Sequence, residues 1–228
     1  MVGKSKKSTA QSSAYSLILD KIIRERLRPG TPLREEHLAE EFGLSPTPIR
    51  EAFCQLEHDG WVTRTPYKGT RLRTFSMKDI DDLYLLREAI EGMAGFLVAE
   101  RGTQSDLDRI RDVLEKEEKN ERQIPEPDEP NPSLSYEPEF DFHAAIVAAS
   151  HSELLVKQHS TLRAQLNLLY FCMQEQEQDD IDAVCAEHRC IFEALSRRWG
   201  ETAESLLRRH IDSARRKILQ TPEIYTAD

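Results

Sequence analysis

The chain has 228 residues, with 31 Lys+Arg, 41 Asp+Glu and a net charge of −10. Residues 1–75 contain 13 Lys+Arg and 9 Asp+Glu, a net +4, whereas residues 76–228 contain 18 and 32, a net −14. A basic first part and an acidic second part indicate two domains, of which only the first meets a phosphate-bearing partner.

The composition argues against a membrane or secreted protein. No segment approaches the roughly 20 apolar residues of a membrane span, and the polar residues 1–13 lack the apolar core of a secretory signal. We expect residues 1–13 to be a disordered arm. The four cysteines lack metal-finger or disulfide-framework spacing, so we interpret them as reduced thiols of a cytoplasmic protein.

The first domain is predicted over residues 14–75. Apolar spacing indicates helices over about 14–27 and 34–42, and Gly43 is suited to close the second helix in a left-handed conformation. A third helix is expected from Thr47, as N-cap, with Pro48 at the first helical position. Two strand patterns follow at 61–64 and 70–73. This order predicts a winged helix-turn-helix, which places its recognition helix in the DNA major groove.

Several residues of this domain suit contacts with duplex DNA. Arg50 lies in the first turn of the third helix, from which an arginine can donate two hydrogen bonds to guanine O6 and N7. Lys68 at the wing tip suits phosphate, and Gly69 allows close backbone approach. The alternative is a winged helix that binds protein rather than DNA.

The second domain, predicted over residues 76–222 and followed by a tail at 223–228, is helical almost throughout. Six helices with mostly short loops predict an antiparallel all-α bundle, so the fold class is mostly α. The Pro-rich stretch Ile124–Pro138 is expected to be an exposed connection. The helices are predicted over 76–101, 104–123, 138–149, 153–176, 180–199 and 201–219.

Four residues of the bundle form a candidate site for a divalent metal. Glu139 and His143 share one helix face at a spacing of four, while His188 and His210 lie beside apolar stripes on two other helices. A histidine beside an apolar stripe is also typical of a hydrogen-bonded core residue. The other histidines have no partner at useful spacing, and we assign them no function: His37, His58, His151 and His159.

Arg87 lies among apolar residues of the first body helix, where a buried cation needs an anionic partner. The alternative is an ion pair with Glu91, four residues later on the same helix, or a surface position.

Residues 14–73 resemble the GntR family of bacterial transcription regulators. The residues that carry the resemblance include Arg28-Pro29-Gly30, Leu38-Ala39-Glu40, Gly43-Leu44-Ser45, Thr47-Pro48-Ile49-Arg50-Glu51-Ala52, Gly60 and Gly69. The family usually has arginine where this chain has Pro46, so base reading is expected to depend on Arg50, Ser45 and Thr47.

Residues 76–220 are similar to the FCD effector domain of the FadR branch of that family, through Leu86-Arg87-Glu88-Ala89-Ile90-Glu91, Phe142-His143, Glu187-His188-Arg189-Cys190-Ile191 and Arg209-His210-Ile211. The resemblance implies a bound zinc, nickel or manganese ion. Its ligands would be Glu139, where the family normally has Asp, with His143, His188 and His210. It also implies that Arg87 faces a small carboxylate effector. Arg163 is a second, weaker candidate.

Together the resemblances imply a homodimeric repressor rather than an enzyme, binding a palindromic operator and responding to the carboxylate. Two alternatives stay open: a metal-dependent enzyme using the same site, and a sensor of metal alone.

Overall fold

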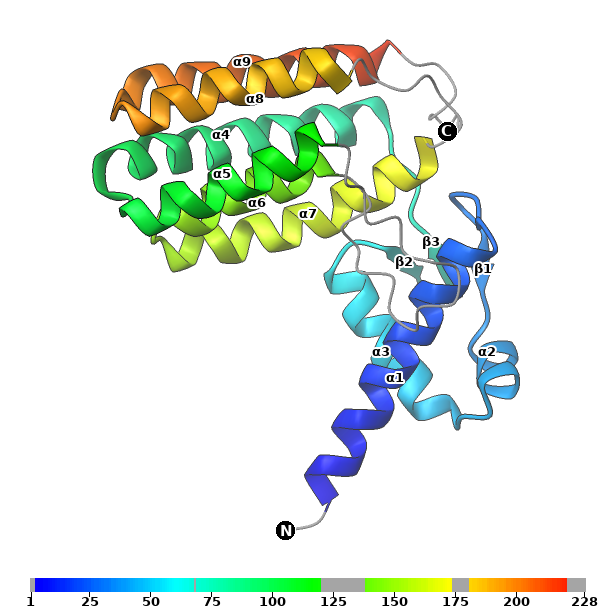
Figure 1. Cartoon of the computed structure of the whole chain (residues 1–228). Helices are drawn as coiled ribbons and strands as arrows, with labels where there is room; N and C mark the ends of the chain where they lie inside the picture. The colour runs from blue at the N-terminus through cyan, green and yellow to red at the C-terminus, as the bar shows by residue number, and fades with distance from the viewer. Residues whose placement is uncertain (1–2, 68, 120–137, 174–180, 221–228) are drawn as a thin grey trace.

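The computed structural model describes residues 3–67, 69–119, 138–173 and 181–220. They form two parts, a head with a small sheet and an all-helical body, joined where α4 begins (Figure 1). The predicted fold class is confirmed. In the described part of the chain, no helix has the length and apolar character needed to cross a membrane.

The head is a three-helix domain with a three-stranded antiparallel sheet in the order β1-β3-β2. In the longer strand pair, β2 with β3, Val62 lies opposite Leu72 and Thr65 lies opposite Gly69. Ile18 of α1, Ile49 and Phe53 of α3 are fully buried between the helices. The elements are α1 (Gly3–Arg24), β1 (Pro32–Leu33), α2 (Glu35–Phe42), α3 (Pro46–His58), β2 (Val62–Thr65) and β3 (Gly69–Leu72).

The start of α3 differs from the prediction. Ser45, not Thr47, is the N-cap, and Pro46 takes the first helical position. Both Pro46 and Pro48 fit in the first turn because the amides there have no acceptor within the helix. Pro48 occupies the third helical position and has no N–H to donate to the Ser45 side chain, which makes no cap hydrogen bond.

Two further features of the head were not expected. Residues 3–13, expected to form a disordered arm, are helical as part of α1. Pro32–Leu33 adds a short third strand to the wing. Gly43, as predicted, is left-handed, with φ 64°, and closes α2.

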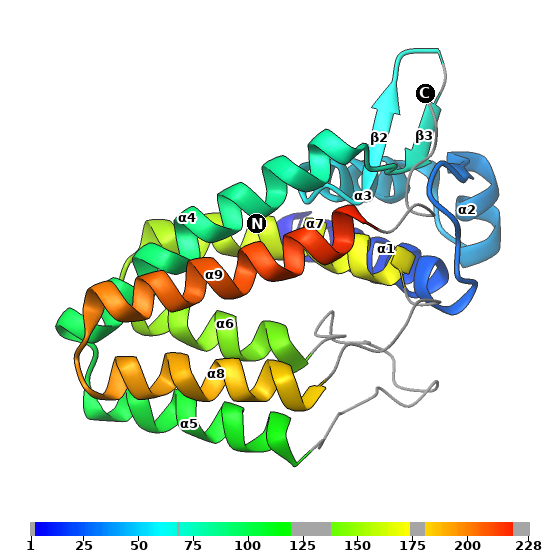
Figure 2. The ribbon, with the colours of Figure 1, turned by 90° about the horizontal axis from the view of Figure 1, so that it is seen from above.

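The body consists of antiparallel helices around α4, which packs on α9 along its length and also contacts α6, α7 and α8 (Figures 1 and 2). Capping boxes begin α4 and α5, where the Asp79 and Asp106 carboxylates accept hydrogen bonds from the backbone N–H groups of Ser76 and Thr103. Of the predicted connection at 124–138, all but Pro138 lies outside the described residues, as does the predicted tail at 223–228. The helices are α4 (Met77–Arg101), α5 (Gln104–Glu118), α6 (Pro138–Ala149), α7 (Glu153–Met173), α8 (Ile181–Ser196) and α9 (Gly200–Leu219).

A contact between the head and α7 fixes how the two parts meet. Arg73 Nη1, just after β3, donates a hydrogen bond of 2.7 Å to Gln165 Oε1 of α7. Gly60 lies under the same glutamine with φ 80°, and a Cβ there would come within 2.5 Å of Gln165 Cγ. Only glycine therefore suits this position, both for its backbone and for the space available.

Candidate DNA interface and metal centre

The first turn of α3 is exposed, as a recognition helix requires. Ser45, Thr47 and Arg50 are all exposed, whereas Ile49 on the opposite face is fully buried. Without DNA, the Arg50 guanidinium is paired with Glu35 of α2, at 2.9 Å from Nη2 and 3.1 Å from Nε to the same carboxylate oxygen. The guanidinium that we expect to read a base is thus held by a neighbouring acid.

The wing tip presents one residue that the sequence did not single out. Tyr67 is fully exposed and has a positive φ of 64°, unusual for a residue with a side chain. Gly69 is exposed at the start of β3 with φ 78°. Lys68, predicted to contact phosphate, lies outside the described residues.

Three buried histidines from three helices meet in the body. His143 of α6 and His188 of α8 are fully buried, and His210 of α9 is 5% exposed. One nitrogen from each lies within 4.8 Å of the others, and the Nε2 atoms of His188 and His210 are 3.4 Å apart. The sequence grouped these residues on spacing and resemblance, and the structure places them together.

Each of these histidines has its Nδ1 against a glutamate. Glu91 Oε2 lies 2.5 Å from His143, Glu117 Oε2 lies 2.9 Å from His188, and Glu187 Oε2 lies 2.5 Å from His210. A carboxylate on one nitrogen fixes the ring orientation and tautomer and makes the other nitrogen a better metal ligand. Sequence reasoning missed this role for the three glutamates.

The surroundings favour the neutral imidazole that metals require. Burial lowers the pKa of His143, although the nearby Glu91 acts in the opposite direction. The Phe142 ring stacks on His188, with centroids 4.3 Å apart, and so restricts that imidazole further. The donor set and its surroundings therefore fit a divalent ion. Glu139 lies in α6 as predicted, but its side chain is outside the described part of the structure.

A buried ion pair supports the histidine cluster from α4. Arg87 is fully buried, and its Nε donates a hydrogen bond of 3.0 Å to Glu91 Oε1, the intrahelical pair left open as the alternative. His159 of α7 contacts the same oxygen at 3.0 Å, so it has a buried partner that sequence spacing did not reveal. Burial alone would raise the pKa of Glu91, but Arg87 and His143 hold it well below its usual value.

Arg163 lies four residues after His159 on α7 and is half-buried. Residues four apart emerge from one face of a helix, so Arg163 shares a face of α7 with His159, which contacts Glu91. A second polar contact between the same two helices joins the hydroxyls of Tyr84 and Tyr170. The face between α4 and α7 is therefore unusually polar for a helical core.

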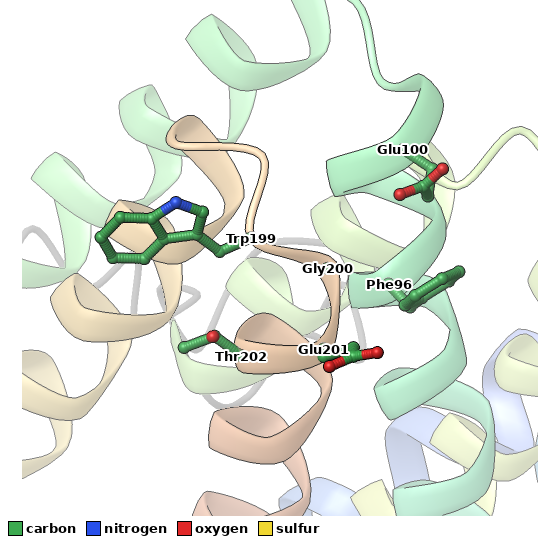
Figure 3. A pocket seen from close by; sticks show the side chains of 6 residues that line it. All are labelled: Phe96, Glu100, Trp199, Gly200, Glu201 and Thr202. Atoms are coloured by element: carbon green, nitrogen blue, oxygen red, sulfur yellow. The ribbon is translucent and has the colours of Figure 1, made fainter.

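A shallow hollow of about 590 Å³ lies elsewhere, where the end of α4 meets the turn before α9. It is lined by Phe96, Glu100, Trp199, Gly200, Glu201 and Thr202, none of which belongs to the histidine cluster. Figure 3 shows the Trp199 indole pointing away from Phe96 and Glu100. With no convergent polar groups, this hollow is a poor candidate for a ligand site.

Comparisons with known proteins agree with both parts of the chain. Residues 10–72 match the bacterial regulatory proteins of the gntR family, and residues 82–213 match the FCD domain. The HTH-type regulator YdhC of Bacillus subtilis is 28% identical over 87% of this chain and 86% of its own. The HTH-type transcriptional repressor RspR of Escherichia coli is 23% identical over 90% of this chain and 87% of its own.

Solved structures agree in fold. A structure described as a GntR regulator from Rhodococcus sp. RHA1 has a TM-score of 0.71 and 22% identity, covering 93% of this chain and 99% of its own. McbR/YncC of E. coli has a TM-score of 0.71 and 21% identity, covering 96% and 99%. The matched family and the named sequence relatives are transcriptional regulators rather than enzymes, so the metal-dependent enzyme is set aside. The chain belongs to the GntR family of bacterial regulatory proteins, as a DNA-binding transcriptional regulator with an FCD effector domain.

Proposed function

We propose that this regulator is a homodimeric repressor whose affinity for a palindromic operator changes when a small carboxylate binds beside a divalent metal in the body. The observation that supports this proposal is the buried cluster of His143, His188 and His210, each with a glutamate on its Nδ1. Three neutral imidazoles in such a setting are a ligand set suited to zinc, nickel or manganese.

The metal would be held by the three histidines, with Glu139 as the proposed fourth ligand. When bound, it would supply a positively charged centre for an oxygen anion. We propose that the chain supplies the rest of the selectivity for an acid through Arg87 of α4 and Arg163, which shares a face of α7 with His159. Arg87 is also paired with Glu91, so we propose that it acts partly by holding that carboxylate against His143.

The proposed route from this site to the DNA-binding head runs along α7. His159 contacts Glu91 at one point of the helix, and Gln165 contacts Arg73 of the head less than two turns later. A shift of α7 on effector binding would therefore change the position of the head. An effector can alter operator affinity only by binding one arrangement of the heads more tightly than the other.

The homodimer follows from the two-fold symmetry of operators, in which one recognition helix occupies each half-site. Repression is supported by two relatives that are named as repressors, RspR and the "Probable D-xylose utilization operon transcriptional repressor" of Paenarthrobacter nicotinovorans. Duplex DNA as the partner also supports a cytoplasmic location.

The test begins with an operator selected from a pool of random duplexes. The affinity of the protein for this operator is measured by fluorescence anisotropy, once with chelator-treated protein and once with protein loaded with zinc, nickel or manganese. Each measurement is repeated after adding small mono- and dicarboxylic acids from a panel. We expect one acid to change the affinity of the metal-loaded protein by about 5- to 150-fold. The chelated protein should not respond to the acid.

Variants separate the parts of the proposal. His188→Ala should lose the acid response but keep operator binding, whereas His151→Ala, half-exposed and outside the cluster, should keep both. Arg50→Ala should weaken binding to the selected operator by about 10- to 100-fold and leave binding to random DNA nearly unchanged. An acid response without metal would contradict the metal's role, and a large change with metal alone would favour the metal-only sensor.

A further inference from the structure

The outward face of α4 carries a continuous apolar stripe. Leu85, Leu86 and Met93 are between 41% and 47% exposed, and the exposed Ala89 lies between them at helical spacing. Phe96 continues the stripe and is half-buried. Large apolar side chains gathered on one helix face, rather than scattered singly, mark an interaction surface.

The opposite face of α4 is fully used within the chain. The glycines of α4 allow close packing on α9: a Cβ on Gly95 would lie 2.3 Å from a Leu207 methyl carbon. Ala94 and Val98 of α4 are fully buried. Figure 2 shows α4 along the outer edge of the body, beside α9. In the described ranges, no other helix covers the stripe.

We propose that the stripe is covered by α4 of a second copy of this chain, running antiparallel and crossing at Ala89. This inference rests on the proposed homodimer and assigns the surface that forms it. In such a pair, Leu85 lies opposite Met93 of the second copy. The small Ala89 faces its own counterpart at the crossing, where close approach of two helices needs a small side chain.

The charges at the ends of the stripe match this arrangement. Lys78, highly exposed in the first turn, and Glu100, exposed in the last, lie at equal distances from Ala89. Antiparallel pairing therefore places each Lys78 opposite Glu100 of the other copy, at both ends of the interface. A parallel pair would place like charges together.

The proposed pairing also predicts the spacing of the two heads. Each head joins its body where α4 begins at Met77, twelve residues before Ala89. At a rise of 1.5 Å per residue, the two junctions lie about 36 Å apart along the paired helices. Successive half-sites on one face of DNA are separated by about 34–36 Å. Self-pairing at Ala89 thus separates the heads by about one turn of DNA.

Disulfide cross-linking tests the register directly. Ala89→Cys is placed in a background with Ser at the exposed Cys54 and Cys190 and at Cys172. Two Cα atoms facing each other across a close crossing lie within the range that a disulfide spans. We expect a covalent dimer after mild oxidation. Asp82→Cys is the matched control, because its two copies would be about 21 Å apart.

Substitution of the stripe tests the surface by oligomeric state, measured by light scattering on the full chain. Leu85→Glu should raise the dimer dissociation constant by about 100-fold, as expected for charge buried in an interface. Leu154→Glu makes the same chemical change at an exposed leucine of α7 and should leave the dimer intact. Circular dichroism and metal content should match the parent protein in both variants.

The outcomes are distinguishable. A dimeric protein that Ala89→Cys fails to cross-link and Leu85→Glu fails to dissociate would overturn this surface but leave the homodimer. A monomer on operator DNA would overturn both the surface and the homodimer, without touching the metal and effector proposal.

Discussion

Glu91→Gln should destabilise the body strongly, because it removes the carboxylate that the Nε of the fully buried Arg87 contacts. Both side chains are inaccessible to solvent, and the pair is 3.0 Å apart. Removing one partner of a buried ion pair costs about 3–5 kcal/mol. The amide oxygen can still accept one hydrogen bond, so we expect about 3 kcal/mol, a large part of the 5–15 kcal/mol typical of folded domains.

Urea unfolding followed by circular dichroism, in chelator so that metal binding does not contribute, measures this cost. The second substitution, Arg87→Met, removes the buried cation that has lost the Glu91 carboxylate, while the amide still faces the histidines. The double variant should therefore recover at least about 1 kcal/mol relative to Glu91→Gln. Glu115→Gln, in the exposed pair with Lys119, is the matched control and should change stability by about 0.5 kcal/mol or less.

Glu91→Gln should also weaken metal binding by about 10- to 100-fold, because Glu91 orients His143. Competition with a chromogenic chelator measures this affinity. Unchanged stability in Glu91→Gln, or no recovery in the double variant, would refute the view that Arg87 depends on Glu91 for its burial.

Three other changes test separate parts of the molecule. Glu35→Gln should release Arg50 and increase operator affinity about two- to fivefold in anisotropy titrations, whereas unchanged or weaker binding would show that Glu35 assists the arginine. Burial would raise the pKa of Asp106, but the hydrogen bonds of its capping box outweigh burial and lower this pKa to about 2. The stability that the ionised Asp106 gives the fold is therefore complete above the ordinary carboxyl pKa of 3.8. The difference in urea midpoint between parent and Asp106→Asn should then shrink as the pH falls from 5 towards 2; a constant difference would contradict this origin. Gly60→Ala should clash with Gln165 and weaken the coupling between acid and operator, and an unchanged acid response would exclude that contact from the route.

Local signals determined most of the secondary structure. The bounds of α6 agree with the prediction, and Gly43 closes α2 in the expected conformation, because apolar period and backbone preference act within a few residues. The start of α3 was misplaced because two prolines both suit a first helical turn, and spacing alone does not choose between them. The strand at Pro32–Leu33 is too short to show a period and exists only through its pairing with β3.

The sequence by itself determined the two-domain plan, the exposed first turn of the recognition helix and the identity of the three histidines. The first two follow from composition and from spacing along single helices, which fixes which side chains share a face. The histidines were identified by their spacing together with the resemblance to the FCD domain. The tertiary structure alone decided the partners of those faces: Glu91 with His143, Glu117 with His188, and Glu35 with Arg50. These partners lie on different helices, and the rotation of one helix against another is set by packing of the whole core, which no local pattern encodes.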